Sequence, residues 1–397
     1  MAEWRTARLG EIIKTNQSTY SPKENWRFVN YLDTGNITMN RIDEIQYINP
    51  AKDKLPSRAR RKVKTNSIIY STVRPNQLHY GIINEQPDNF LVSTGFAVID
   101  VDCDKAVPNF IYYALTKQEV TEQLQAIAEQ SVSAYPSIKP SDIENLELMF
   151  PDIKMQERIV SILSLMDEKI KNNNAINNNL LEQVLSIYRH RFVDTANELR
   201  QTCRADEYFD ISIGKTPPRK ELQWFSTNPK DVTWVSISDM GTCGLYISES
   251  SEQLTREAVD HHNVKIVPDN TILLSFKLTV GRIAITNGEM SSNEAIAHFK
   301  TDKKEINEYL YCYLKCFNYQ TMGSTSSIAT AVNSKIIKSM PFVVPTDEEI
   351  NEFHSLAAPM FAKIKANQSE MSNLTVLRDT LLPKLMSGEL DISDIDL

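Results

Sequence analysis

The longest regular pattern of apolar positions in the chain lies in residues 152–193. Apolar or amide side chains recur there in alternating steps of four and three, with no glycine and no proline between them, which is the spacing of a long helix that packs lengthwise on another helix. These seam positions are Ile159, Leu163, Met166, Ile170, Asn173, Asn177, Leu180, Val184 and Ile187. At about 1.5 Å per residue such a helix extends on the order of 60 Å, so we expect a spacer.

The same rhythm returns 194 positions later, and a proline precedes each copy, Pro151 before the first and Pro345 before the second. The second seam consists of Phe353, Ala357, Met360, Ile364, Asn367, Met371, Leu374, Leu381 and Leu385. The alternative is two unrelated amphipathic helices, each packing on its own local core. The shared offset, proline and asparagine favour a repeat in which each globular block is followed by a long helix.

The two blocks themselves retrace one another. Residues 233–239 match 27–33, residues 270–275 match 66–71, residues 309–314 match 110–115, and residues 340–345 match 146–151. We therefore assign residues 1–150 and 196–344 to two similar domains of mixed α/β (α+β) fold, residues 151–195 and 345–388 to the long helices, and residues 389–397 to an acidic tail. Since each block precedes its own helix, the prediction is a long antiparallel two-helix coiled coil that separates the domains, with a pseudo-twofold internal repeat.

Asn173 and Asn367 lie near the midpoints of the two helices and are equivalent at the offset of 194. In an antiparallel pair these amides would face each other, and a buried amide pair fixes the register because a slip leaves polar groups without partners. We predict that the two side chains approach closely. The alternative is that the surrounding asparagines only form a solvated face.

Bulk properties indicate a globular protein of two or three domains, with 397 residues and 41% hydrophobic content. Apolar runs of the 18 or more residues that span a membrane are missing from the sequence, so we expect a cytoplasmic location. Five cysteines follow neither disulfide nor zinc spacing. The net charge of −8 is concentrated towards the end of the chain, and each block is close to neutral, so the charge does not exclude nucleic acid.

Two stretches of the first block are candidates for contact with DNA. Residues 52–64 hold seven basic residues and one acidic residue, which suits phosphate binding, although a solvated loop is an equally good interpretation. Residues 74–80 read as an exposed turn whose Arg, Asn and Gln side chains can form paired hydrogen bonds with base edges; an ordinary polar hairpin is the alternative. The candidates are Arg58, Arg60, Arg61, Lys62, Lys64, Arg74, Asn76, Gln77, His79 and Tyr80.

The second block carries different polar segments at the corresponding places, residues 214–220 and 277–282. Its candidates are Lys215, Arg219, Lys220, Lys277, Thr279 and Arg282. One scaffold with two different sets of polar loops suggests two readers for two different targets.

Motifs for catalysis or metal binding are missing. Gly214-Lys215-Thr216 imitates the end of a phosphate-binding loop, but Phe209 stands where that loop needs its first glycine. Ser275 occupies the place of a carboxylate that a metal-dependent nuclease requires. The six histidines show no metal-ligand spacing. We therefore expect a protein that is not an enzyme and carries no cofactor or metal of its own.

The chain resembles the DNA-specificity subunit of type I restriction-modification enzymes over nearly its whole length. The segments that carry the resemblance are GKTPPRKELQW at residues 214–224, VTWVSISDMGTCGLYI at 232–247 and NTILLSFKLTVGRIAI at 270–285. The first block departs from this pattern, with KTNQSTYSP at residues 14–22 in place of the Gly-Lys-Thr-Pro segment and Arg74-Pro75 in place of residues 279–282.

This resemblance implies two target-recognition domains, each reading one half of a bipartite, asymmetric sequence in double-stranded DNA, with the helix pair setting the gap. It also implies two methyltransferase subunits and two motor-nuclease subunits as partners, which would supply S-adenosylmethionine, ATP and Mg²⁺. Exposed apolar residues on the helices would dock the methyltransferase, namely Val160, Leu165, Leu377 and Leu382. A coiled-coil scaffold or adaptor that does not bind DNA is the alternative.

Overall fold

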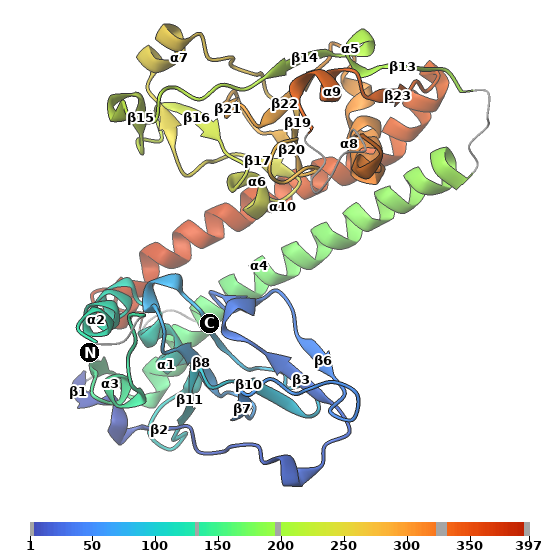
Figure 1. Cartoon of the computed structure of the whole chain (residues 1–397). Helices are drawn as coiled ribbons and strands as arrows, with labels where there is room; N and C mark the ends of the chain where they lie inside the picture. The colour runs from blue at the N-terminus through green and yellow to red at the C-terminus, as the bar shows by residue number, and fades with distance from the viewer. Residues whose placement is uncertain (1–3, 132–134, 195–199, 323–331, 393–397) are drawn as a thin grey trace. The chain divides into compact units, whose positions relative to one another are not determined.

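The computed structural model describes residues 4–131, 135–194, 200–322 and 332–392. The predicted boundary at residues 195 and 196 and the last part of the predicted acidic tail, from residue 393, lie outside the described residues. The chain forms two compact units, one within Met1–Glu168 and Leu374–Leu397, the other Lys169–Asn373. Each unit therefore contains one globular block together with a part of each long helix (Figure 1).

The first block is built on two four-stranded sheets, ordered β2-β11-β8-β9 and β6-β3-β10-β7. Their strands are β2 Ile13–Thr15, β3 Val29–Leu32, β6 Gln46–Ile48, β7 Ala59–Lys62, β8 Ile68–Ser71, β9 Tyr80–Ile82, β10 Phe90–Ser93 and β11 Phe96–Val101. Further elements are β1 Arg5–Arg8 paired with β12 Glu147–Phe150, the short pair β4 Ile37–Thr38 and β5 Arg41–Ile42, and the helices α1 Pro108–Leu115, α2 Gln118–Glu129 and α3 Pro140–Glu144.

The second block has a five-stranded sheet, ordered β14-β22-β19-β20-β17, and a four-stranded sheet, ordered β15-β18-β16-β21. Their strands are β14 Asp210–Ile213, β15 Phe225–Ser226, β16 Val232–Val235, β17 Tyr246–Ile247, β18 Gln253–Leu254, β19 Ile272–Ser275, β20 Ile283–Thr286, β21 Ser291–Ser292 and β22 Ile296–Lys300. The block also contains β13 Thr202–Arg204 paired with β23 Pro341–Val343, and the helices α5 Ala205–Tyr208, α6 Asp239–Thr242, α7 Arg256–His262, α8 Asn307–Cys316 and α9 Ser334–Lys338.

The central strands of both blocks follow from unbroken runs of side chains that are all buried, IIYS in β8 and ILLS in β19. Such runs are typical of a strand covered on both faces. β19 lies between β22 and β20 as β8 lies between β11 and β9. In the other four-stranded sheet of the first block β3 pairs with β10 in parallel, and in the four-stranded sheet of the second block β16 pairs with β21 in parallel. The blocks, as described, thus share one arrangement of central strands.

Helix α4 spans Ile153–Tyr188 and continues as a short π-helix to Asp194, and α10 spans Asp347–Ser387. Every seam position in both helices is buried or half-buried, as the spacing indicates. In the first unit Arg378 bonds Asp167 at 2.7 Å, and in the second Asn367 bonds Asn177 at 2.8 Å and Arg191 bonds Glu352 at 3.1 Å. In the second unit the contacts run from residue 177 to 191 on α4 as they run from 367 to 352 on α10, so the helix segments of this unit are antiparallel.

The predicted contact between Asn173 and Asn367 is wrong, because each of these side chains bonds a different residue of the other helix. Both side chains are buried, with 2% and 1% of their surface exposed, but Asn367 donates to Asn177, and Asn173 donates to Glu370 at 2.7 Å. Asn173 and Asn177 are one turn apart and lie on the same face of α4. The estimate from the helix midpoint therefore missed the register by one turn.

Each block packs on the helix segments of its own unit. In the first, a buried cluster includes Phe110 of α1, Leu163 of α4 and Leu385 of α10. In the second, Tyr309 of α8 packs in one cluster with Val184 and Phe353. The five cysteines are free thiols, and among the residues that the structure describes no helix combines the length and apolar character needed to cross a bilayer.

Candidate nucleic-acid interface

The turn between β8 and β9 presents three of the candidate residues to solvent. Arg74, Asn76 and Gln77 are exposed at the 3-10 turn Pro75–Gln77, and the Arg74 guanidinium lies 5.0 Å from the centre of the Tyr135 ring. Stacking on an aromatic face holds a guanidinium while leaving its edge donors available. The turn therefore offers a positioned fork of donors beside two amide side chains.

The last two candidates of this turn are corrected by the structure. Tyr80 is the first residue of β9, is only 4% exposed and stacks on Tyr70, and burial raises its pKa to about 12. His79 is half-buried, with Nδ1 at 2.6 Å from the carbonyl oxygen of Ile37. Neither side chain is placed to stack on a base, because β9 already begins at Tyr80, the last residue of the predicted turn, and His79 contacts the backbone of Ile37.

The basic stretch of the first block is only partly a loop. Residues Ala59–Lys62 form β7 at the edge of a sheet, with Ala59 and Val63 buried. Arg60, Arg61 and Lys62 are half-buried, and Lys62 forms an ion pair with Glu24 and lies 5.2 Å from the Trp26 ring centre.

Only two of the five predicted cations in this stretch are exposed, Arg58 and Lys64, and Lys64 lies 3.7 Å from Asp100. A strand sends alternate side chains to opposite faces. The predicted phosphate-binding cluster is therefore divided between the two faces of a sheet edge.

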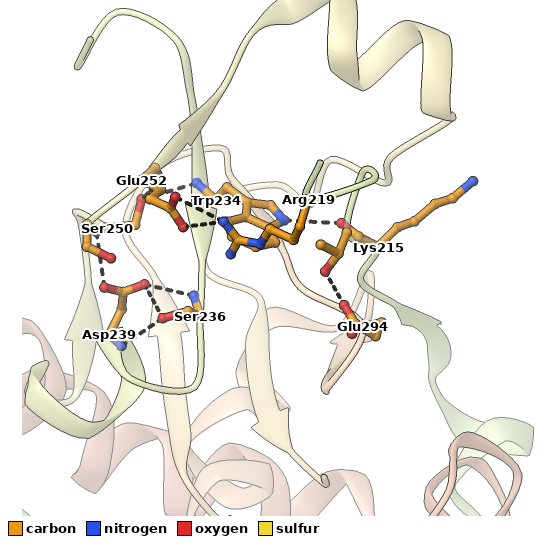
Figure 2. A network of polar contacts seen from close by, with 10 residues as sticks. Lys215, Arg219, Trp234, Ser236, Asp239, Ser250, Glu252 and Glu294 are labelled. Atoms are coloured by element: carbon orange, nitrogen blue, oxygen red, sulfur yellow. Dashed lines mark hydrogen bonds and ion pairs between the residues drawn. The ribbon is translucent and has the colours of Figure 1, made fainter. Parts of the chain in front are cut away.

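In the second block, the segment around Lys215 and Arg219 is fixed by a polar and aromatic network (Figure 2). Arg219 donates to both carboxylate oxygens of Glu252 at 3.0 and 2.8 Å, and its guanidinium lies 4.4 Å from the Phe225 ring and 4.6 Å from the Trp234 ring. The indole nitrogen of Trp234 donates to the Lys215 carbonyl at 3.1 Å. Arg219 therefore stabilises this segment, while the exposed Lys215 and Lys220 lie beside it.

Two carboxylates anchor the same region. Asp239 accepts hydrogen bonds from the backbone and hydroxyl of Ser236 at 2.8 and 2.7 Å. Burial acts to raise the pKa of Asp239, but these bonds and that from Ser251 outweigh it and lower the pKa. Glu294 accepts from the Thr216 hydroxyl, which together with nearby cations lowers its pKa against the effect of burial. Both groups are held ionised, as structural acceptors.

The β19–β20 turn combines exposed and structural residues. Lys277 and Thr279 are exposed, and Leu278 between them is 100% exposed. Arg282 is half-buried and donates to the carbonyl oxygen of Ile237 at 2.6 Å, across Gly241, where any Cβ would lie 2.4 Å from the guanidinium. Arg282 thus connects the turn to α6 and has a structural role, whereas the sequence predicted an exposed residue that contacts DNA.

A contact that sequence reasoning missed fixes the second block on α10. The Gln368 side chain pairs with both backbone groups of Tyr246 in the edge strand β17, accepting from its N–H at 3.0 Å and donating to its carbonyl at 3.0 Å. Gly244 permits this approach, because a Cβ there would lie 2.5 Å from the Gln368 amide nitrogen. In the sequence, only Gly244 indicated that the backbone here could be approached so closely.

Two of the four predicted docking residues on the helices are exposed, Leu165 at 60% and Leu377 at 46%. Val160 and Leu382 are half-buried and pack against the core of the first block. The prediction that these two belong to an exposed flank is wrong, because the block covers that part of the helices.

Among the described residues, no group of three or more His, Cys, Asp or Glu side chains is placed to hold a metal ion.

The structure is that of a two-domain repeat protein whose domains share their central strands and differ in their exposed polar turns. The family model for the type I restriction modification DNA specificity domain matches residues 1–182 and again residues 198–355. The chain belongs to this family.

Three known proteins show the extent of the similarity. The type I restriction enzyme HindI specificity subunit of Haemophilus influenzae is 25% identical, over 98% of this chain and 100% of its own length. The MjaIX specificity subunit of Methanocaldococcus jannaschii is 25% identical, over 74% of this chain and 71% of its own. The crystal structure of a type I restriction-modification S subunit from M. genitalium shares the fold, with a TM-score of 0.57, 17% identity and coverage of 99% and 97% of the two chains.

Proposed function

We propose that this chain is the non-catalytic, DNA-binding specificity subunit of a type I restriction-modification complex. Each domain reads one half of a bipartite, asymmetric site in the major groove of duplex DNA. One observation supports this function most directly: the two domains repeat one arrangement of strands but carry two different exposed turns, in a chain that the specificity family matches twice. A shared frame with unlike turns suits two half-sites of unlike sequence.

In this proposal the helix pair sets the distance between the two half-sites. Readers on a flexible linker would sample many separations, whereas a stiff antiparallel coiled coil, with a pseudo-twofold relation between the halves, keeps the half-sites at a fixed spacing and rotation. The buried Asn177–Asn367 bond and the Asp167–Arg378 ion pair support this, since each holds one register of α4 against α10.

Partner subunits provide the chemistry. Two methyltransferase subunits, which bring S-adenosylmethionine, dock on the helices, and two motor-nuclease subunits use ATP and Mg²⁺; the complex acts in the cytoplasm. Leu165 and Leu377 are the exposed apolar residues proposed for docking, since apolar side chains on the surface of a helix favour a protein partner. The double variant Leu165→Asp/Leu377→Asp is expected to lose co-purification with the methyltransferase, while Asn172→Asp, an exposed change on α4, keeps it. Unchanged assembly of the double variant would refute this docking role.

Binding to duplex DNA tests the main proposal. The chain, purified with its methyltransferase subunit, is titrated with specific and nonspecific duplexes at several salt concentrations. We expect tighter binding to one bipartite sequence, weakened by salt because phosphate contacts release counterions. Lys277→Ala is expected to weaken binding and reduce the salt slope, while Lys304→Ala, an exposed lysine outside the candidate segments, leaves both unchanged. Binding to no duplex under any condition would instead support the scaffold alternative.

A further inference from the structure

Both domains have a residue with an unusual backbone conformation at the equivalent position of the turn that follows the central strand. Three residues after the end of the central strand, Arg74 follows β8 and Leu278 follows β19. Neither is a glycine, yet both adopt the left-handed backbone conformation, with φ of 48° and 59°. This conformation is unfavourable for residues with a Cβ, so its recurrence indicates a constraint that belongs to the turn.

The turns are held by the same device. The serine that ends each central strand bonds the turn that follows it: the Ser71 hydroxyl donates to the Val73 carbonyl at 2.9 Å, and the Ser275 hydroxyl donates to the Thr279 carbonyl at 2.6 Å. Ser71 and Ser275 are themselves fully or almost fully buried. Each turn is therefore tied to the central strand, and its outermost side chain is presented in a defined direction.

Neither side chain is buried in this strained position. Leu278 is fully exposed, although burial of a leucine side chain stabilises a folded protein. Arg74 is exposed and stacked on Tyr135, and among the described residues no carboxylate forms an ion pair with it. Both domains thus keep a strained residue outside their cores, which is how a contact for a partner molecule is maintained.

We propose that this position decides a base in each half-site, with Arg74 reading a guanine and Leu278 the methyl group of a thymine. The inference rests on the proposed function and names the chemistry that its two domains recognise. A guanidinium with free edge donors matches the O6 and N7 acceptors of guanine. The C5 methyl of thymine is the apolar group on the major-groove edge of DNA, and an exposed leucine matches it. Lys277, next to Leu278, is placed for a neighbouring phosphate.

Mapping of modified bases tests both assignments at once. Wild-type and variant complexes with the methyltransferase are expressed in a host without other modification, and the modified sites are sequenced. Arg74→Leu is expected to relax discrimination at one guanine of one half-site by about tenfold or more. Leu278→Ala is expected to relax one thymine of the other half-site, and the gap is expected to stay unchanged in both variants.

Conservative variants separate a specific contact from misfolding. Arg74→Lys keeps the positive charge but lacks the paired donors, so it is expected to retain DNA binding and lose guanine discrimination. Leu278→Met keeps an apolar contact and is expected to retain the thymine preference. In binding assays, deoxyuridine in place of that thymine removes only the methyl group; it is expected to weaken binding of the wild type and to leave Leu278→Ala unaffected.

The outcomes distinguish this inference from the function on which it rests. A wild-type complex that modifies a bipartite site, with variants that leave both half-sites unchanged or alter both together, overturns the inference and leaves the proposed function intact. A wild-type complex that neither binds nor modifies DNA overturns the proposed function itself.

Discussion

The amide pair between the long helices gives the sharpest test of their register. Asn177 accepts a hydrogen bond from Asn367 at 2.8 Å, and both side chains are buried. Replacing Asn177 with leucine leaves the buried Asn367 amide without this acceptor. We expect Asn177→Leu to lower the free energy of unfolding by about 1–3 kcal/mol, the cost of a buried polar group that has lost its partner.

The double variant separates this cost from the loss of an attraction. With Asn177→Leu and Asn367→Leu together, no amide of the pair is left unsatisfied and two leucines pack in the seam. Stability is then expected to return to the wild-type value or exceed it. The matched control is Asn178→Leu, the same exchange at the exposed neighbouring position, with an expected effect within about 0.5 kcal/mol.

Urea unfolding measures the free energies of the wild type, Asn177→Leu, Asn367→Leu, the double variant and Asn178→Leu under the same conditions. The reasoning is refuted if Asn178→Leu costs as much as Asn177→Leu, since the effect would then not depend on burial. It is equally refuted if the double variant loses the sum of the two single losses, because two independent contacts would behave in that way.

Three further predictions concern other contacts. Gln368→Leu removes both bonds to the backbone of Tyr246, and hydrogen exchange at that amide is expected to quicken while exchange in the first unit is unchanged. Burial, assisted by Lys300, lowers the pKa of His298 from 6.5 to about 4. The stabilising contribution of the neutral His298 is therefore complete above pH 6.5 and is lost as the pH falls towards 4. The urea midpoint of His298→Gln should fall less steeply over that pH range than the midpoint of the wild type. Arg378→Leu leaves Asp167 without its cation, and urea unfolding should show a loss of about 1–3 kcal/mol.

Several features of the structure could be predicted because they depend on short-range patterns. The seam spacing identified the buried face of both helices, and the matched residues 66–71 and 270–275 contain the equivalent strands β8 and β19. The matched segments identified the shared frame of the two blocks, and the motifs at residues 214–224, 232–247 and 270–285 pointed to the family that the chain belongs to.

The candidate site was predicted less well, because exposure depends on what packs against a turn from elsewhere in the chain. Arg74, Asn76, Gln77 and Lys277 are exposed as expected, whereas Tyr80 is enclosed by the core and Arg282 is committed to Ile237. The sequence did not indicate that Leu278 is exposed, because a leucine within an apolar segment is expected to be buried.

The sequence by itself determined which residues face inward along each helix and strand, because the periodicity of the backbone determines which side chains share a face. Only the tertiary structure decided which residues meet: Asn367 bonds Asn177 rather than Asn173, and Gln368 bonds the edge strand β17. The Leu278 side chain is not covered by any of the residues that the structure describes. Local periodicity carries no information on the partner that another segment supplies, and a slip of one turn leaves the pattern almost unchanged. The contacts that choose between such registers are the buried polar ones.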